Sequence, residues 1–161
     1  MTSPPPNVSR RFDWLGVLAR WILGATFVYL GGVKALHPVD FLKLLREYDL
    51  VQNYWWLNAI AGILPWLEII CGLLLLSGIA VRGTAVVVSG LLAAFTAVIF
   101  HRAMALMALK SLAFCAVKFN CGCGNGEVVA CHKLIENTCL ILLSLALALG
   151  HGRKFCFRYQ F

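Results

Sequence analysis

Four long runs of apolar residues constrain this chain more than any other feature of its sequence. They cover residues of about 15–34, 57–79, 83–102 and 134–150. Each run lies in the range of roughly 17–25 residues that an α-helix needs to cross a bilayer, and none alternates like the shorter strands of a membrane barrel. Lipid offers the backbone no hydrogen-bond partners, so such runs must be helical. We therefore expect an all-α integral membrane four-helix bundle over residues 13–152.

Composition and charge agree with a membrane protein and exclude a soluble domain. Hydrophobic residues make up 61% of the chain and charged residues 13%, about half the charged share of soluble domains. The net charge of +7 does not indicate nucleic-acid binding, because the basic residues lie mostly at the ends of apolar runs and form no stripe with interleaved aromatics. We expect membrane lipid, and no nucleic acid, as a partner.

The two ends of the chain are predicted to lie outside the bundle. Residues 1–12 include three consecutive prolines and predict a disordered cytoplasmic tail, and residues 153–161 form a basic C-terminal tail. The first apolar run is too long for a signal peptide and has no small-residue cleavage site before the next polar stretch. It is therefore expected to be a retained helix.

A short amphipathic helix is predicted between the first and second spans, over residues of about 39–49. Proline 38 suits a helix start. Apolar side chains at helical spacing share one face and charged side chains the other, as in a helix that lies in the membrane interface. The apolar face comprises Phe41, Leu44, Leu45 and Tyr48.

The segment between the third and fourth spans is less regular. Residues 103–117 are apolar but too short for a separate crossing, so they either extend the third helix or lie along the interface. Residues 119–132 are expected to form a tight cysteine loop, because they include three glycines between Cys121 and Glu127.

The distribution of Lys and Arg does not by itself settle the orientation of the bundle. The basic residues on the side of the cysteine loop are spread over longer loops. We predict a bacterial inner membrane location with both termini in the cytoplasm. The cysteine loop then faces the oxidising compartment, where disulfides persist.

Three of the seven cysteines, Cys121, Cys123 and Cys131, cluster in this polar loop. A bond between Cys121 and Cys123 closes a small strained ring, and strain makes a disulfide easily reduced. The pair therefore suits thiol–disulfide exchange, with Cys131 as the resolving thiol. A structural bridge from Cys121 or Cys123 to Cys131 is an equal alternative. A metal site that adds His132 is disfavoured because adjacent residues point in different directions, so no metal is expected.

Glu68 is a single carboxylate inside the second span, where a charge costs about 2.5–3.5 kcal/mol near the bilayer centre. It therefore needs a partner. Lys34 ends the first span at a level that Glu68 can reach if the two antiparallel helices touch. The favoured interpretation is a structural ion pair, and the alternative is a proton-handling or quinone-head-group site beside the thiol loop.

Several segments together resemble the DoxX-like superfamily of small four-helix membrane proteins, in particular its MauE (methylamine utilisation) branch. The resemblance covers residues of about 27–124 and is carried by residues 27–34, His37-Pro38, Asp40-Phe41, residues 48–50, Leu64-Pro65-Trp66-Leu67-Glu68, residues 72–75, Gly78 and Cys121-Gly122-Cys123-Gly124. It implies an inner-membrane protein linked to disulfide redox, some of whose relatives are quinone-linked or act with thioredoxin-like proteins. Cys121 and Cys123 carry over as the matching pair.

Together these features predict a membrane thiol–disulfide redox protein that acts through Cys121 and Cys123, with Cys131 resolving. Its expected partner is a periplasmic thioredoxin-like or disulfide-rich protein, and quinone is a candidate second carrier. The alternative is a non-catalytic accessory subunit of a larger membrane complex.

Overall fold

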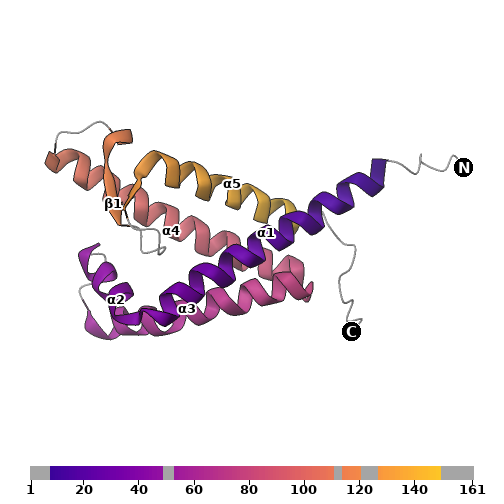
Figure 1. Ribbon diagram of the computed structural model, residues 1–161, viewed down its shortest axis with the longest axis horizontal. Helices are drawn as coiled ribbons and strands as arrows, with labels where there is room; N and C mark the ends of the chain where they lie inside the picture. Colours follow the sequence, from indigo (N-terminus) through magenta and orange to yellow (C-terminus); the bar gives the residue numbers. More distant parts are fainter. Residues whose placement is uncertain (1–7, 49–52, 111–113, 121–126, 150–161) are drawn as a thin grey trace, which may run out of the picture.

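The computed structural model describes residues 8–48, 53–110, 114–120 and 127–149 (Figure 1). Cys121, Cys123 and the basic C-terminal tail lie outside these residues. The elements are, in chain order, helices α1 (Val8–Leu36), α2 (Pro38–Glu47), α3 (Tyr54–Ser77) and α4 (Val81–Lys110), a short 3₁₀ helix η1 (Phe114–Ala116), strands β1 (Lys118–Asn120) and β2 (Glu127–Val129), and helix α5 (Ala130–Ala148).

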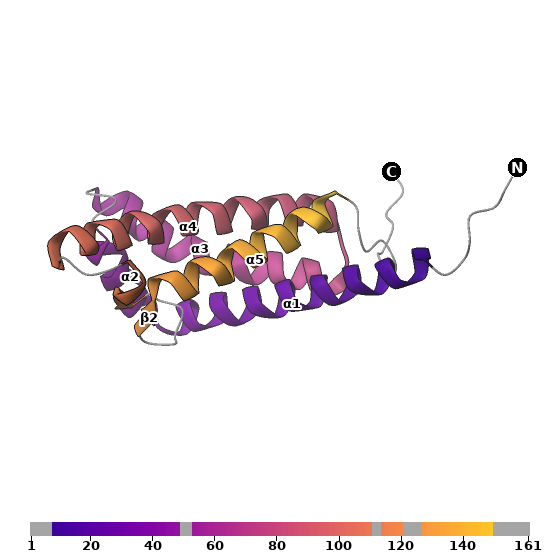
Figure 2. The ribbon, with the colours of Figure 1, turned by 90° about the horizontal axis from the view of Figure 1, so that it is seen from above.

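Four of these helices are long and apolar enough to cross a membrane: Trp14–Leu36, Tyr54–Ser77, Val81–Leu109 and Ala130–Ala148. They run side by side along the length of the molecule (Figure 2). Many large apolar side chains point outward, such as Ile63, Trp66 and Ile70 on α3, and in a membrane such side chains contact lipid. The predicted all-α membrane bundle is confirmed.

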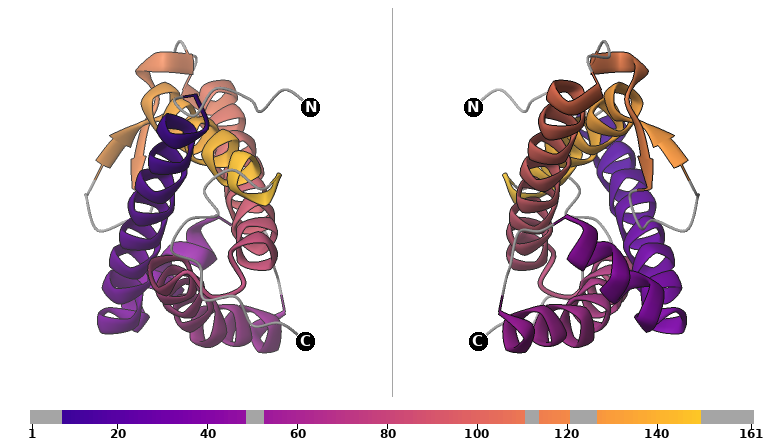
Figure 3. Two further views of the ribbon diagram at one scale, coloured as in Figure 1. Left: turned by 90° about the vertical axis from the view of Figure 1, so that its right-hand side faces the viewer. Right: turned by 90° about the vertical axis from the view of Figure 1, so that its left-hand side faces the viewer.

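The bundle consists of two tightly packed helix pairs. Helix α1 packs along α3 and α4 along α5, whereas the α1–α5 and α3–α4 contacts are smaller (Figure 3). Glycines bring α1 and α3 close together. A Cβ added at Gly24 would lie 2.9 Å from the carbonyl oxygen of Gly72, and one added at Gly31 would lie 2.7 Å from that of Pro65. Small residues allow this approach between membrane helices.

Helix α2 folds against one end of the bundle, as its amphipathic sequence requires. Its buried face, with Phe41 and Leu44, continues into Tyr48. Leu44 and Tyr48 join a core cluster with Ile99 of α4 and Ala130 of α5. This end of the molecule, made of α2, η1, the two strands and the first turn of α5, is called the cysteine end below.

Strands β1 and β2 form a two-stranded antiparallel hairpin, in which Lys118 pairs with Val129 and Asn120 with Glu127. The backbone N–H of Ala130 donates to the carbonyl of Val117 at 3.0 Å and so closes the open end of the hairpin. The sequence predicts an irregular loop from residue 119 to 132. In the structure, residues 118–120 and 127–129 within and beside this loop pair as two antiparallel strands.

Other boundaries also differ from the sequence-based expectation. Helix α1 begins at Val8, so residues 8–12, predicted to be part of a disordered tail, are helical. Residues 7–12 contain no proline or glycine that would prevent a helix there. Residues 103–110 continue helix α4. Helix α5 begins at Ala130 rather than near residue 134, because the hairpin ends directly before it.

The glycine contact between α1 and α3 predicts different effects for two adjacent substitutions. Gly31→Leu should destabilise the protein by about 1–3 kcal/mol, because the new side chain meets the α3 backbone. Gly32→Leu is the matched control, since a Cβ at Gly32 has no neighbouring atom within 4 Å. Equilibrium unfolding of both variants in mixed micelles measures the difference. Equal stability of the two variants would contradict the close packing.

Candidate functional site

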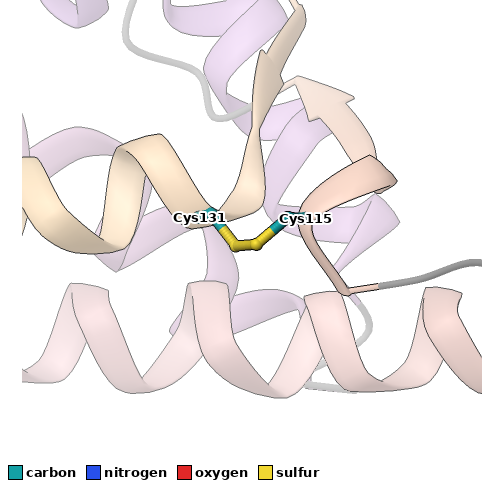
Figure 4. The surroundings of a disulfide bond; sticks show 2 residues. All are labelled: Cys115 and Cys131. Atoms are coloured by element: carbon teal, nitrogen blue, oxygen red, sulfur yellow. A yellow bond between two sulfur atoms is a disulfide. The ribbon is translucent and has the colours of Figure 1, made fainter.

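The cysteine end contains a disulfide between Cys115 and Cys131, 16 residues apart in sequence, with their Cα atoms 5.1 Å apart. Figure 4 shows the bond between η1 and the first turn of α5. The side chain of Cys115 is exposed and that of Cys131 is half-buried. The bond therefore fixes the segment that follows α4 to the start of α5.

The β1–β2 hairpin lies between the two bonded cysteines in sequence. Its strands end at Asn120 and Glu127, which are opposite each other. Cys121 follows Asn120 directly in the chain, and Cys123 is two residues further on. Four of the seven cysteines thus belong to one segment, from residue 115 to 131.

The observed pairing differs from the roles that sequence reasoning considered for Cys131. The bridge from Cys121 or Cys123 to Cys131 is not the arrangement in the structure, because Cys131 is bonded to Cys115. In this state Cys131 also has no thiolate to ligate a metal. Sequence reasoning missed Cys115 because the residues around it are apolar and were not assigned to the loop.

A second group of residues lies inside the bundle at the same end. Four buried polar side chains line a small cavity between α1, α3, α4 and α5: Lys34, Glu68, Lys133 and Asn137. They are 3%, 9%, 4% and 2% exposed, respectively. The cavity has a volume of about 30 Å³. Lys133 is two residues after Cys131 and Asn137 one turn further along α5, so the disulfide and this polar cluster share a helix.

Lys34 and Glu68 form a buried ion pair between α1 and α3, with Nζ and Oε1 2.5 Å apart. The Lys34 ammonium also lies 5.4 Å from the ring centre of Phe41 and 5.3 Å from that of Phe95. A cation near aromatic faces is stabilised by the ring quadrupoles, most strongly where water is excluded. The charge of Lys34 is therefore held by residues of α2, α3 and α4 together.

The cluster is not fully hydrogen-bonded within the described residues. Glu68 Oε2 and Asn137 Nδ2 are both buried and have no hydrogen-bond partner there. Lys133 Nζ donates to Glu136 Oε2 at 2.9 Å, and the Glu136 side chain is 44% exposed. The cluster thus extends from a buried carboxylate to one that reaches the surface.

Lys133 and Asn137 were not recognised as site residues from the sequence. They are spaced four apart, which places them on the same face of a helix. That spacing was the available signal, but it has meaning only once the helix is known to begin at Ala130 and to turn this face toward Glu68.

The buried ion pair predicts a strong asymmetry between single and double substitution. Lys34→Met should destabilise the protein by about 3–5 kcal/mol, because it leaves Glu68 buried without its ion-pair partner, and Lys34→Met/Glu68→Leu should recover most of that loss. Lys43→Met is the control: Lys43 pairs with Asp40 at 3.6 Å with both side chains 72% exposed, and its loss should cost less than about 1 kcal/mol. Unfolding in mixed micelles measures all three. No recovery in the double variant would contradict this account.

No match was found among curated proteins or among solved structures. The model of the family described as "Methylamine utilisation protein MauE" matches residues 12–150. The matched region contains the disulfide and the whole buried polar cluster, and it covers far more than half of the sequence. The chain belongs to the MauE family.

Proposed function

We propose that this chain is a membrane thiol–disulfide redox protein of the DoxX-like superfamily that serves methylamine utilisation. The observation that carries the proposal is the Cys115–Cys131 disulfide at one end of the bundle, with Cys121 and Cys123 between those residues in sequence. A purely structural role needs one bridge. Four cysteines in 17 residues supply two pairs, which is the minimum for passing a disulfide from one pair to another.

The exchange is proposed to run in steps that conserve electrons. A thiolate of the partner protein attacks a Cys121–Cys123 disulfide and forms a mixed disulfide, and a second partner thiolate then releases it. The partner leaves with a disulfide, and Cys121 and Cys123 hold two thiols. One of these thiolates attacks the Cys115–Cys131 bond at Cys131 and displaces Cys115 as a thiolate, and the other then attacks this mixed disulfide and releases Cys131. The Cys121–Cys123 disulfide is thereby restored, and Cys115 and Cys131 hold the two thiols. A second protein disulfide accepts the two electrons and restores the starting state.

Quinone, the candidate second carrier from the sequence, is not used in this scheme. The polar cavity of about 30 Å³ is far smaller than a ligand pocket of roughly 300–1,000 Å³. A larger groove between α3 and α4 is lined mostly by apolar residues, and its polar groups are the Trp66 indole and the Cys71 thiol. No step of the exchange is therefore derived through quinone.

Orientation follows from the chemistry of the disulfide. Disulfides persist in oxidising compartments, which favours the periplasmic side of a bacterial inner membrane for the cysteine end. Helix α1 begins and helix α5 ends at the opposite end of the bundle (Figure 2), so both termini are proposed to be cytoplasmic. The partner is proposed to be a disulfide-rich or thioredoxin-like periplasmic protein. An accessory subunit without redox chemistry would need no exposed sulfur at Cys115, and we do not adopt that alternative.

Differential alkylation tests this function. Spheroplasts are equilibrated over a series of dithiol redox buffers and treated with a membrane-impermeant maleimide, and mass spectrometry reads each cysteine separately. We expect Cys115, Cys121, Cys123 and Cys131 to interconvert between thiol and disulfide and to react from the periplasmic side. Cys71 and Cys139, which are free, are the internal references whose labelling should not depend on the buffer.

Two results would contradict the proposal. If Cys115, Cys121, Cys123 and Cys131 stay oxidised under strong reductant, their disulfides are purely structural. Labelling of these cysteines only after the inner membrane is permeabilised would reverse the orientation and remove the periplasmic partner.

A further inference from the structure

The charged side chains in and beside the polar cavity are two lysines and two glutamates. Helix α1 contributes Lys34, α3 contributes Glu68, and α5 contributes Lys133 with its partner Glu136. The part of α4 that lines the cavity is apolar, and α2 adds only the Phe41 ring beside Lys34. Each ammonium group thus pairs with one carboxylate, of which Glu68 lines the cavity and Glu136 is partly exposed. One proton more or less changes the charge of this set by one unit.

One acceptor and one donor in this cluster lack hydrogen-bond partners within the described residues, and a water molecule can satisfy both. Glu68 Oε2 can only accept and Asn137 Nδ2 can only donate, and both are buried without a partner in the described residues. A water molecule donates to the first and accepts from the second. A water needs about 10–15 Å³ of such space and two to four polar partners. The cavity of about 30 Å³, lined by four polar side chains, meets both requirements.

We propose that this cavity is a hydrated proton-exchange site, in which bound water links Glu68 to Asn137 and, through the Lys133–Glu136 pair, to the aqueous surface at the cysteine end. A proton from that surface reaches Glu68 Oε2 through the water and makes the carboxyl neutral. The Lys34 charge is then held by the rings of Phe41 and Phe95. The reverse transfer restores the ion pair.

The functional part of this inference rests on the proposed thiol–disulfide function. In each exchange the attacking thiol loses a proton and the leaving thiolate gains one. Lys133 is two residues from Cys131 on the same helix, so the site lies where such protons are released and taken up. Glu68 is therefore assigned as the group that holds a proton in one redox state of the cysteine end and releases it in the other.

Hydration is tested first, by X-ray hydroxyl-radical footprinting of the protein in nanodiscs with mass spectrometry. Radicals formed from bound water modify adjacent side chains. Phe27 lines the cavity and is only 3% exposed, so its labelling reports internal water. We expect Phe27 to be labelled in the native protein, to lose the label in Asn137→Leu, and to keep it in Thr138→Val, whose exposed side chain lies outside the cavity lining. An unlabelled Phe27 in the native protein would overturn the site.

Proton exchange is tested by infrared difference spectra of the oxidised and dithiol-reduced protein. We expect a protonated-carboxyl band that changes on reduction and shifts in D₂O. The band should disappear in Glu68→Gln. It should persist in the control variant Glu47→Gln, which alters the exposed ion pair of Glu47 with Arg102. If Glu68→Gln does not assemble, Asn137→Leu keeps the carboxyl and should slow the D₂O shift. In the double variant Cys115→Ser/Cys131→Ser, the intensity of the band should not change when reductant is added.

These outcomes separate the two proposals. If the band of the native protein is the same in both redox states, protonation of Glu68 is not coupled to the cysteines and this inference is overturned. The alkylation test of the redox function does not depend on that result. Failure of the alkylation test removes the redox function, and footprinting then still decides whether the cavity is hydrated.

Discussion

The buried ion pair between Lys34 and Glu68 is the interaction on which most of this structure depends. An isolated charge is costly inside a membrane, and the packing of α1 on α3 brings the two residues together as an ion pair. That packing is possible because Gly31 has no side chain: a Cβ there would lie 3.0 Å from the Cβ of Glu68. The same ammonium lies beside Phe41 and Phe95. One contact therefore fixes α1 and α3 and helps to place α2 and α4.

The fourth spanning helix connects this interior to the cysteine end. Within three turns α5 carries Cys131, Lys133 and Asn137. Its start is fixed to η1 by the disulfide and to the hairpin by the Ala130 backbone hydrogen bond. A change at the disulfide therefore acts on the helix that carries two of the four cavity-lining polar side chains. This arrangement joins the proposed thiol chemistry to the proposed proton site without requiring a long pathway.

The sequence was informative where a single physical constraint dominates. Lipid makes the apolar runs helical, and the cost of an isolated charge pointed from Glu68 to Lys34, which lie 2.5 Å apart in the structure. It was less informative where contacts join distant segments. The Cys115–Cys131 pairing depends on the path of the chain between α4 and α5, and the inward face of Lys133 and Asn137 depends on where α5 begins. Cys121 and Cys123 lie outside the described residues, so their predicted role is unchanged as a proposal.

Trapping the mixed disulfide tests most directly whether this membrane protein exchanges disulfides with a soluble partner. Cys121→Ser and Cys123→Ser each remove one sulfur of the exchanging pair, and Cys139→Ser removes a free exposed cysteine as the control. Cells are acid-quenched and alkylated, and membranes are analysed under non-reducing conditions with mass spectrometry. The account predicts a one-to-one mixed disulfide with a periplasmic protein in at least one of the first two variants and none in the control. Absence of any such adduct from both variants, with the proteins folded, would contradict it.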